Sequence, residues 1–339
     1  MTESESQLRV LITDYAWKSL EPEKEILRTA GAGLVVAASG DEEELISLAG
    51  DVDAILTCWK SVTRKVIEQA PACQIIGRYG IGLDNIDVSY ATEMGIVVTN
   101  VPSYCLEEVS DHAMALLLAC ARKVVFFDRA IKGGEYSLPL GSPLYRIRGR
   151  TLGIMGFGKI GRTLYRKAAG FGLKIIVHDP YLDAGSIEDY DVTLVDFDQL
   201  LQESDFISIH VPLSAETENL FNLSAFQKMK NTASVINTSR GGVIDSTALL
   251  QALEEGEIAS AALDVLPKEP PAADDPLVHH PKTIITPHAA FYSEESILDL
   301  QRIAATQVAD LLSGKLPESV VNRAVLDQAN LRAKLDLSE

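Results

Sequence analysis

The sequence has few cysteines, and none of them fall in a metal-binding pattern. The four residues Cys58, Cys73, Cys105 and Cys120 are scattered, with no CxxC pair and no Cys/His cluster at zinc-finger spacing. Such spacing argues against a zinc domain or a disulfide scaffold, and no metal site is expected. We expect reduced, mostly buried thiols.

Long apolar runs are also missing. The most apolar helical stretch, Ala113–Ala121, is about nine residues long and ends at Arg122, whereas a membrane-spanning helix needs ~20 residues. The first residues, MTESESQ, have neither the basic nor the apolar part of a secretory signal. The sequence therefore predicts a cytoplasmic protein with no membrane partner.

Positive charge is scarce. The chain carries 30 Lys and Arg against 48 Asp and Glu, a formal charge of −18, which repels nucleic acid and anionic membranes at long range. No nucleic-acid partner is expected. The hydrophobic fraction of 47% is ordinary for a globular protein, and a length of 339 residues predicts two domains at roughly 100–200 residues each.

Short apolar runs alternate with helix-like segments along most of the chain. Leu8–Thr13 and Ala54–Thr57 are examples from the first part, and a second series of the same kind begins at Thr151. Each run is bounded by Gly, Pro or Asp, as expected for strands of a parallel sheet covered by helices. The repetition predicts doubly wound α/β domains.

Three longer segments interrupt this alternation. We expect one long connecting helix from Glu107 to about Gly133, and a last amphipathic helix from Glu294 to about Ser313. The polar tail from Asp327 onward is expected to be poorly ordered.

A glycine motif directly follows the strand predicted at Leu152–Met155 and opens a helix. It reads Gly156-Phe-Gly158-Lys159-Ile160-Gly161. Its first glycine permits a tight turn, the second lets the backbone approach a pyrophosphate, and the third lets helix pack on strand. The backbone N–H groups at the helix start would hold the anion. The motif predicts a dinucleotide site.

An acidic residue, Asp179, follows the next predicted strand, 18 residues after Gly161. A carboxylate there can accept hydrogen bonds from ribose hydroxyls and would repel a 2′-phosphate. The cofactor predicted from these residues is therefore NAD.

Three further segments place polar or charged residues just after a buried strand, the edge at which doubly wound sheets bind ligands. They cover residues 237–242 (NTSRGG), 264–270 (DVLPKEP) and 286–290 (TPHAA). The arginine, Arg240, offers a planar fork of donors suited to a carboxylate and carbonyl. The histidine, His288, can donate or accept a proton near neutral pH.

These segments, with GFGKIG and the RYGIGLDNID sequence at residues 78–87, resemble the signatures of the D-isomer-specific 2-hydroxyacid dehydrogenases. The resemblance spans nearly the whole chain. Within the family, RIRGRTLGIMGFG, HDPYLDAG and PHAAFYSEES are most similar to the C-terminal-binding-protein branch.

The resemblance implies two Rossmann-like doubly wound domains with a cleft between them. Residues 1–101 and 291–339 would form a flavodoxin-like substrate domain, and residues 102–290 an NAD-binding domain. The implied activity is hydride transfer between NAD and a small 2-oxo or 2-hydroxy acid. A homodimer is implied too, paired through about Val124 to Gly149.

The resemblance also assigns roles. Arg240 would bind the carboxylate and carbonyl, His288 would be the acid/base, and Glu269 would orient His288 and favour its protonated form. The substrate loop would comprise Arg78, Tyr79, Gly80 and Ile81, together with Arg240. The remaining residues of the cofactor site would be Val211, Pro212, Thr217, Thr238, Ser239, Asp264 and His288.

Two departures bear on the substrate. Phe291 stands where the C-terminal-binding-protein branch carries a tryptophan, and Ile81 replaces a small polar residue. The identity of the substrate is therefore left open. Two alternatives also stay open: an NAD(H)-sensing scaffold like the C-terminal-binding proteins, and an enzyme like formate or phosphite dehydrogenase. The complete set of Arg240, Glu269 and His288 favours a 2-hydroxyacid dehydrogenase.

Overall fold

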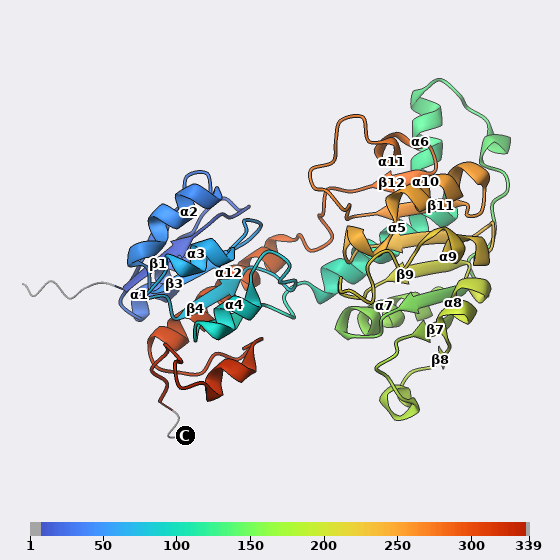
Figure 1. The fold of residues 1–339 in the computed structure, drawn as a ribbon. Coiled ribbons are helices and arrows are strands. Elements are labelled where there is room, and N and C mark those ends of the chain that lie inside the picture. Colours follow the sequence, from blue (N-terminus) through green and yellow to red (C-terminus); the bar gives the residue numbers. More distant parts are fainter. Residues whose placement is uncertain (1–7, 337–339) are drawn as a thin grey trace, which may run out of the picture. The chain divides into compact units, whose positions relative to one another are not determined.

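The computed structural model describes residues 8–336, which form two compact units, each built on its own parallel sheet (Figure 1). Unit 1 comprises the chain up to Tyr104 and from Ser293 onward, and unit 2 comprises Cys105–Tyr292. Across residues 8–336, no helix combines the length and the apolar character needed to cross a bilayer.

The sheet of unit 1 has the strand order β2-β1-β3-β4-β5, with every neighbouring pair parallel. This is the flavodoxin-like order, as predicted. The strands are β1 (Leu8–Ile12), β2 (Ala32–Val36), β3 (Ala54–Thr57), β4 (Ile75–Arg78) and β5 (Val97–Thr99).

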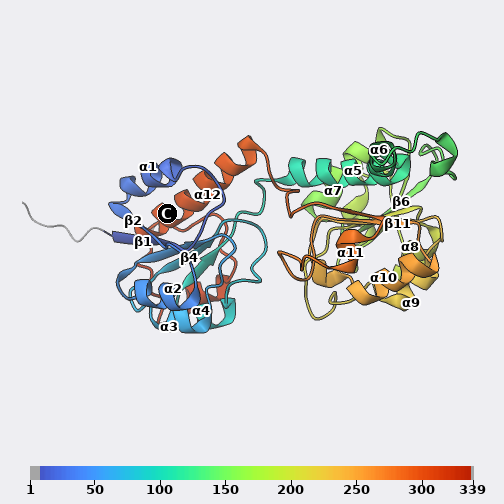
Figure 2. The ribbon, with the colours of Figure 1, turned by 90° about the horizontal axis from the view of Figure 1, so that it is seen from above.

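Helices cover both faces of this sheet, as Figure 2 shows. One face carries α1 (Glu21–Thr29) and α12 (Glu294–Leu312), and the other α2 (Glu42–Leu48), α3 (Arg64–Glu68) and α4 (Val88–Glu93). Alternate residues of a strand point to opposite faces. Val10 and Ile12 accordingly pack in the core beneath α1 and α12, while Leu11 packs in the core on the other face.

The sheet of unit 2 has the order β12-β11-β10-β9-β6-β7-β8, again all parallel. From β8, it is the Rossmann order with one further strand, and the direction of winding reverses between β6 and β9. The strands are β6 (Thr151–Met155), β7 (Lys174–His178), β8 (Thr193–Leu194), β9 (Phe206–Ile209), β10 (Ser234–Asn237), β11 (Ser260–Leu263) and β12 (Thr283–Ile285).

Unit 2 is also layered, with helices on both faces of its sheet (Figure 2). The core under α5 and α7 is separate from the core under the helices that follow β8 to β11. The helices are α5 (Leu106–Arg122), α6 (Val124–Lys132), α7 (Lys159–Ala169), α8 (Phe197–Glu203), α9 (Leu223–Lys228), α10 (Ser246–Glu255) and α11 (Pro276–His279).

The single long helix predicted from Glu107 to about Gly133 is wrong. Lys123 adopts a left-handed conformation with φ of 53°, which ends α5 and separates it from α6. Apolar residues continue across the break, so the pattern of the sequence does not reveal it.

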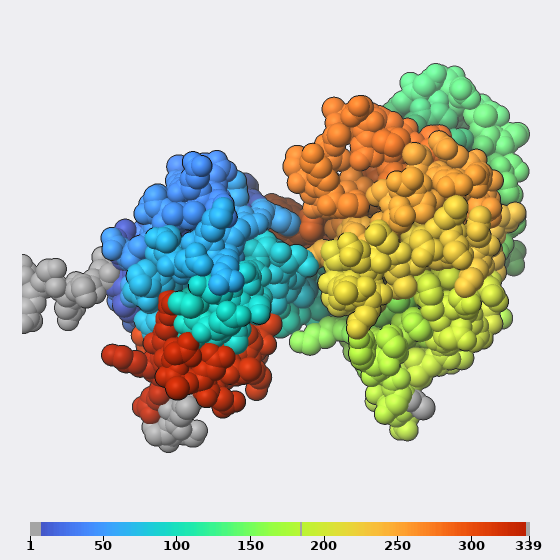
Figure 3. Space-filling view, viewed as in Figure 1, coloured from blue at the N-terminus to red at the C-terminus, as the bar shows by residue number. Residues whose placement is uncertain are grey.

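The disordered tail predicted from Asp327 is also wrong for the residues up to 336. Arg332 donates to the carbonyl oxygens of Ala70 and Cys73 at 2.7 and 3.1 Å, and Ala333 is buried. Figure 3 shows the C-terminal segment, in red, lying against the surface of unit 1. Hydrogen bonds from the Arg332 side chain to backbone carbonyls, together with apolar contacts, hold a segment that looks polar in sequence.

Candidate active site

Arg240, Glu269 and His288 all lie at one edge of the unit 2 sheet. Arg240 follows β10, Glu269 follows β11 and His288 follows β12. The three strands are adjacent and parallel, so their carboxyl ends, where such sheets bind ligands, lie side by side.

The turn that carries Arg240 is shaped by the buried side chain of Asn237. Its amide nitrogen donates to the Arg240 carbonyl at 2.9 Å, and its amide oxygen accepts from the N–H and hydroxyl of Ser239 at 3.0 and 2.8 Å. The Arg240 guanidinium donates to the Ser239 carbonyl at 2.8 Å. Sequence reasoning did not single out Asn237, although an asparagine ending a buried strand is a common turn signal.

The next residue, Gly241, has no room for a side chain. A Cβ there would meet the backbone of Leu266 and Pro267. The Arg240 turn thus packs directly on the backbone of the segment that leads to Glu269.

Glu269 and His288 are directly hydrogen-bonded. Nδ1 of His288 lies 2.7 Å from Oε2 of Glu269, and Oε1 of Glu269 accepts from the Leu266 N–H at 2.8 Å. Burial would raise the pKa of Glu269, but the hydrogen bonds from His288 and Leu266 and the charges of His288 and Arg240 outweigh it and lower that pKa. An ionised Glu269 can then orient the imidazole.

His288 has an unusual backbone. Its φ of 53° lies in the left-handed region, which is sterically costly for a residue with a side chain. Its N–H donates to the carbonyl oxygen of Asp264 at 2.8 Å, and its ring meets that of Phe291 edge-on at 6.3 Å.

The glycine motif has the three environments that a dinucleotide loop requires. Gly156 has φ of 89°, and a Cβ there would crowd the His210 carbonyl. A Cβ at Gly161 would be too close to the Gly156 carbonyl, whereas one at Gly158 would meet nothing within 4 Å. Lys159 and Ile160 form the first turn of α7.

Asp179 follows β7 and contacts this loop. Its Oδ2 accepts from the N–H of Phe157 at 2.9 Å, and its Oδ1 from that of Tyr181 at 3.1 Å. These bonds fix the carboxylate beside the glycine motif, at the position expected of a ribose-binding residue.

The segment after β9 carries Val211, Pro212 and Thr217. The Thr217 hydroxyl donates to the Pro212 carbonyl at 2.6 Å and accepts from the Ser214 N–H at 2.8 Å, closing a compact turn. His210 precedes it, and burial lowers its pKa to about 4, so it is neutral at physiological pH.

Asp264 and Thr238 are the last two of the residues predicted for the cofactor site. Both carboxylate oxygens of Asp264 accept hydrogen bonds from residues 286–290. The Thr238 hydroxyl is buried and has no hydrogen-bond partner among residues 8–336. A buried polar atom without a partner is costly unless a ligand satisfies it, and together with the open space at Gly158 it fits a bound dinucleotide.

The predicted substrate residues are divided between the units, because Arg78 to Ile81 lie in unit 1. Arg78 ends β4, its side chain is buried, and its guanidinium donates to the Tyr79 carbonyl. Gly80 has φ of 148°, and a Cβ there would meet that guanidinium. Asn100 holds the loop by donating to the Ile81 carbonyl at 2.8 Å.

The Tyr79 side chain is anchored inside unit 1. Its hydroxyl donates to Oε1 of Glu23 at 3.2 Å, and the same carboxylate accepts from Trp17 at 3.1 Å and Gln301 at 2.7 Å. Burial raises the pKa of Glu23 despite these bonds. The Tyr79 hydroxyl is therefore not available to a ligand, and the Tyr79 N–H is also engaged, because it donates to the Thr57 carbonyl at 2.8 Å.

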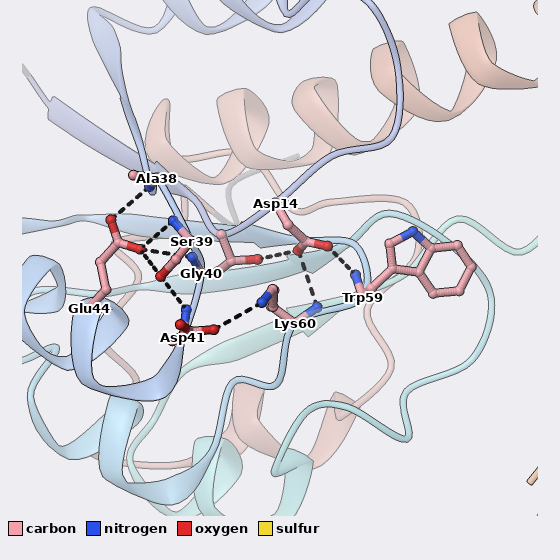
Figure 4. Close-up of polar contacts among 9 residues, drawn as sticks. Asp14, Ala38, Ser39, Gly40, Asp41, Glu44, Trp59 and Lys60 are labelled. Carbon is pink, nitrogen blue, oxygen red and sulfur yellow. Dashed lines mark hydrogen bonds and ion pairs between the residues drawn. The ribbon is translucent and has the colours of Figure 1, made fainter. Parts of the chain in front are cut away.

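The carboxyl edge of the unit 1 sheet is fixed by two carboxylates, shown in Figure 4. Asp14 accepts from the N–H groups of Cys58, Trp59 and Lys60 at 2.7–3.2 Å. Glu44 accepts from residues 38–40, and the N–H of Ala38, the hydroxyl and N–H of Ser39 and the N–H of Gly40 lower its pKa to about 2. The loops beside Arg78 are thus tied down.

The architecture and these motifs agree with comparisons to known proteins. Residues 114–290 match the NAD-binding domain of the D-isomer specific 2-hydroxyacid dehydrogenases. A glyoxylate reductase of Korarchaeum cryptofilum is 39% identical over 293 residues, which are 85% of this chain and 88% of that protein. A D-3-phosphoglycerate dehydrogenase of Methanocaldococcus jannaschii is 39% identical over 328 residues, which are 96% of this chain but only 61% of that protein.

Solved structures agree as well. A glyoxylate reductase from Paecilomyes thermophila superposes with a TM-score of 0.85 at 28% identity, over 94% of this chain and 99% of that chain. A D-lactate dehydrogenase from Aquifex aeolicus, complexed with NAD and lactic acid, gives 0.83 at 25% identity, over 92% of this chain and 98% of that chain. The chain belongs to the D-isomer specific 2-hydroxyacid dehydrogenase family and is an NAD-dependent oxidoreductase.

Proposed function

We propose that this protein interconverts a small 2-oxo acid and the corresponding D-2-hydroxy acid. The observation that carries the proposal is the 2.7 Å contact between His288 and Glu269 at the sheet edge that also bears Arg240. An oriented acid/base beside an arginine is what reduction of a 2-oxo acid requires.

Each of the three residues has a part in this reaction. Arg240 binds the substrate carboxylate and polarises the carbonyl. Because Nδ1 of His288 is bonded to Glu269, Nε2 is the atom that donates a proton to the carbonyl oxygen, or accepts it in the reverse direction. Glu269 stabilises the protonated ring and holds its orientation.

NADH, when bound, supplies the hydride that reduces the carbonyl carbon. The glycine motif, with Gly158 at its open point, would hold the pyrophosphate, and Asp179 the ribose. Thr238, Ser239 and Asp264 belong to the nicotinamide half of the proposed site, and Val211, Pro212 and Thr217 to the adenosine half.

We further propose that unit 1 is the substrate domain and unit 2 the NAD-binding domain. In unit 1, the Arg78 side chain and, of the loop formed by Tyr79, Gly80 and Ile81, the Ile81 N–H would contribute donors for the substrate carboxylate. The N–H groups of Tyr79 and Gly80 already donate to the carbonyls of Thr57 and Arg78 at 2.8 and 2.9 Å. The N–H of Ile81, which lies between two glycines, is therefore the backbone donor we propose for the anion.

The test is loss of absorbance at 340 nm with NADH, and separately NADPH, against glyoxylate, hydroxypyruvate, pyruvate and bulkier 2-oxo acids. We expect turnover with NADH that falls at least 100-fold in kcat/KM in Arg240→Ala, while NADH binding changes less than threefold. Arg28→Ala, which removes an exposed arginine of α1, is the matched control. Tight NADH binding without turnover of any acid would instead favour the NAD(H)-sensing scaffold.

A homodimer remains a prediction, and α6 is the surface we propose for it. None of its residues is buried in the monomer, and Val124, Phe126 and Ile131 expose apolar side chains. Exposed apolar surface of this kind marks protein contacts. Light scattering should give twice the chain mass of 36.8 kDa, and Ile131→Asp should lower it. A wild-type mass of one chain would refute the dimer.

The cytoplasmic location and the likeness to the C-terminal-binding-protein branch also stay predictions. Fractionation of cells producing the tagged full chain tests the first.

A further inference from the structure

The buried carboxylate of Asp264 lies at the centre of a hydrogen-bond network that ends on the segment carrying His288. Its side chain is 1% exposed. Oδ1 accepts from the Thr286 hydroxyl at 2.5 Å and the Ala289 N–H at 2.9 Å, and Oδ2 accepts from the Ala290 N–H at 2.9 Å. Asp264 thus binds residues on both sides of His288 through hydrogen bonds.

The network extends to α5 through His112. Nε2 of His112 lies 2.9 Å from the Thr286 hydroxyl and 3.5 Å from Oδ1 of Asp264. The hydroxyl has one proton, which it donates to the carboxylate, so it accepts from Nε2–H of His112. The hydrogen bonds therefore run from His112 to Thr286 and from Thr286 to Asp264, and His112 must carry a proton on Nε2.

The segment needs such support because of its backbone. His288 is held at φ of 53°, which a residue with a side chain adopts only when its surroundings enforce it. The Asp264 carbonyl fixes the His288 N–H at 2.8 Å, and the Asp264 carboxylate fixes the next two N–H groups. A looser segment would leave the imidazole poorly placed for its bond to Glu269.

We propose that His112 and Thr286, acting through Asp264, are positioning residues that hold His288 in its reactive orientation. This inference rests on the proposed role of His288 as the acid/base. It differs from a cofactor-contact role for Asp264, because it predicts a loss of rate without a matching loss of NADH affinity.

The experiment compares Thr286→Val, which keeps the shape but removes the hydroxyl, with Thr286→Ser, which keeps the hydroxyl. We expect Thr286→Val to lower kcat 10- to 100-fold, with the NADH dissociation constant and the KM for the 2-oxo acid changed less than threefold. Thr286→Ser should recover most of the rate. In a His288→Ala background, Thr286→Val should lower the residual rate no further.

A second pair keeps the test decisive if Thr286→Val does not fold. His112→Leu removes the Nε2 donor, and His112→Gln places an amide nitrogen near the same point. We expect a loss of kcat in the leucine variant and partial recovery in the glutamine variant.

Three outcomes would overturn the proposal: wild-type kcat in both Thr286→Val and His112→Leu, a fall in NADH affinity that accounts for the whole loss, or a further loss in the His288→Ala background. Absence of turnover in the wild-type protein would instead refute the proposed function, and this inference with it. The wild-type assay therefore separates the two failures.

Discussion

Replacing Gly158 or Gly161 of the glycine motif by alanine should impair the protein in different ways: the first change should weaken NADH binding and the second should lower stability. At Gly158, a Cβ meets no atom within 4 Å, and the backbone is extended with φ of −72°, which alanine adopts readily. The gain from a less flexible unfolded chain, about 0.4–1 kcal/mol, roughly offsets the poorer helix N-cap. We expect a free energy of unfolding within about 1 kcal/mol of wild type.

NADH binding should nevertheless suffer in Gly158→Ala. The added methyl would stand where the loop is open and keep the pyrophosphate from the N–H groups. Loss of a hydrogen bond to a charged group costs about 1.5–3 kcal/mol. The dissociation constant for NADH should therefore rise roughly 10- to 150-fold.

Gly161→Ala, in contrast, should lower the stability of the fold. Its Cβ would press on the Gly156 carbonyl and lie 3.3 Å from Ile154, and overpacking of this kind costs about 1–3 kcal/mol. At about 2–4 °C per kcal/mol for a domain of this size, Tm should fall by several degrees.

Titration of NADH fluorescence and thermal unfolding of the same samples measure both effects. Wild-type NADH affinity in Gly158→Ala would refute the assignment of the pyrophosphate to this loop. A Tm as low as that of Gly161→Ala would refute the open space at Gly158.

Three further changes test the network around the site. Glu23→Ala leaves the buried donors of Tyr79 and Gln301, and the partly buried Trp17 N–H, without this acceptor. We therefore expect about 1–3 kcal/mol lower stability in urea unfolding, and an unchanged midpoint would contradict it. Glu44 has its pKa lowered from 4.5 to about 2, so its stabilisation is present above pH 4.5 and lost as pH falls toward 2. Glu44→Gln should therefore lose less Tm between pH 7 and pH 3 than wild type, and an equal loss would exclude this carboxylate as a cause. Glu269→Gln removes the charge beside His288, and kcat/KM should fall about 10- to 100-fold with Tm changed by only a few degrees; steady-state rates at neutral pH decide.

The layered fold was predictable because its signals are local. Short apolar runs bounded by Gly, Pro and Asp predict buried parallel strands, and β3 has the predicted bounds. The break at Lys123 was not predictable, because a left-handed residue between two apolar helical stretches leaves no mark in the pattern. The ordered tail was missed for a related reason, since Arg332 is held by backbone carbonyls far away in sequence.

The residues of the candidate site also fall into those that the sequence predicts and those that only the structure reveals. Arg240, Glu269 and His288 could be named because each follows a strand in a motif of known type. No specific role could be predicted for Asn237, Glu23 and Thr286, because their importance depends on partners that only folding brings together. His112 in particular meets a residue 174 positions later in the chain.

The order of synthesis has a consequence for folding. Unit 2 is continuous, whereas unit 1 is completed only by α12 and the segment after it, which supply Leu300, Ala304 and Val308 to its core. During translation, unit 2 can fold as soon as it leaves the ribosome, while the first hundred residues wait with one apolar sheet face covered by α1 alone. A chaperone that binds nascent chains would find its target in that face, and a chain stopped before α12 should be degraded rapidly.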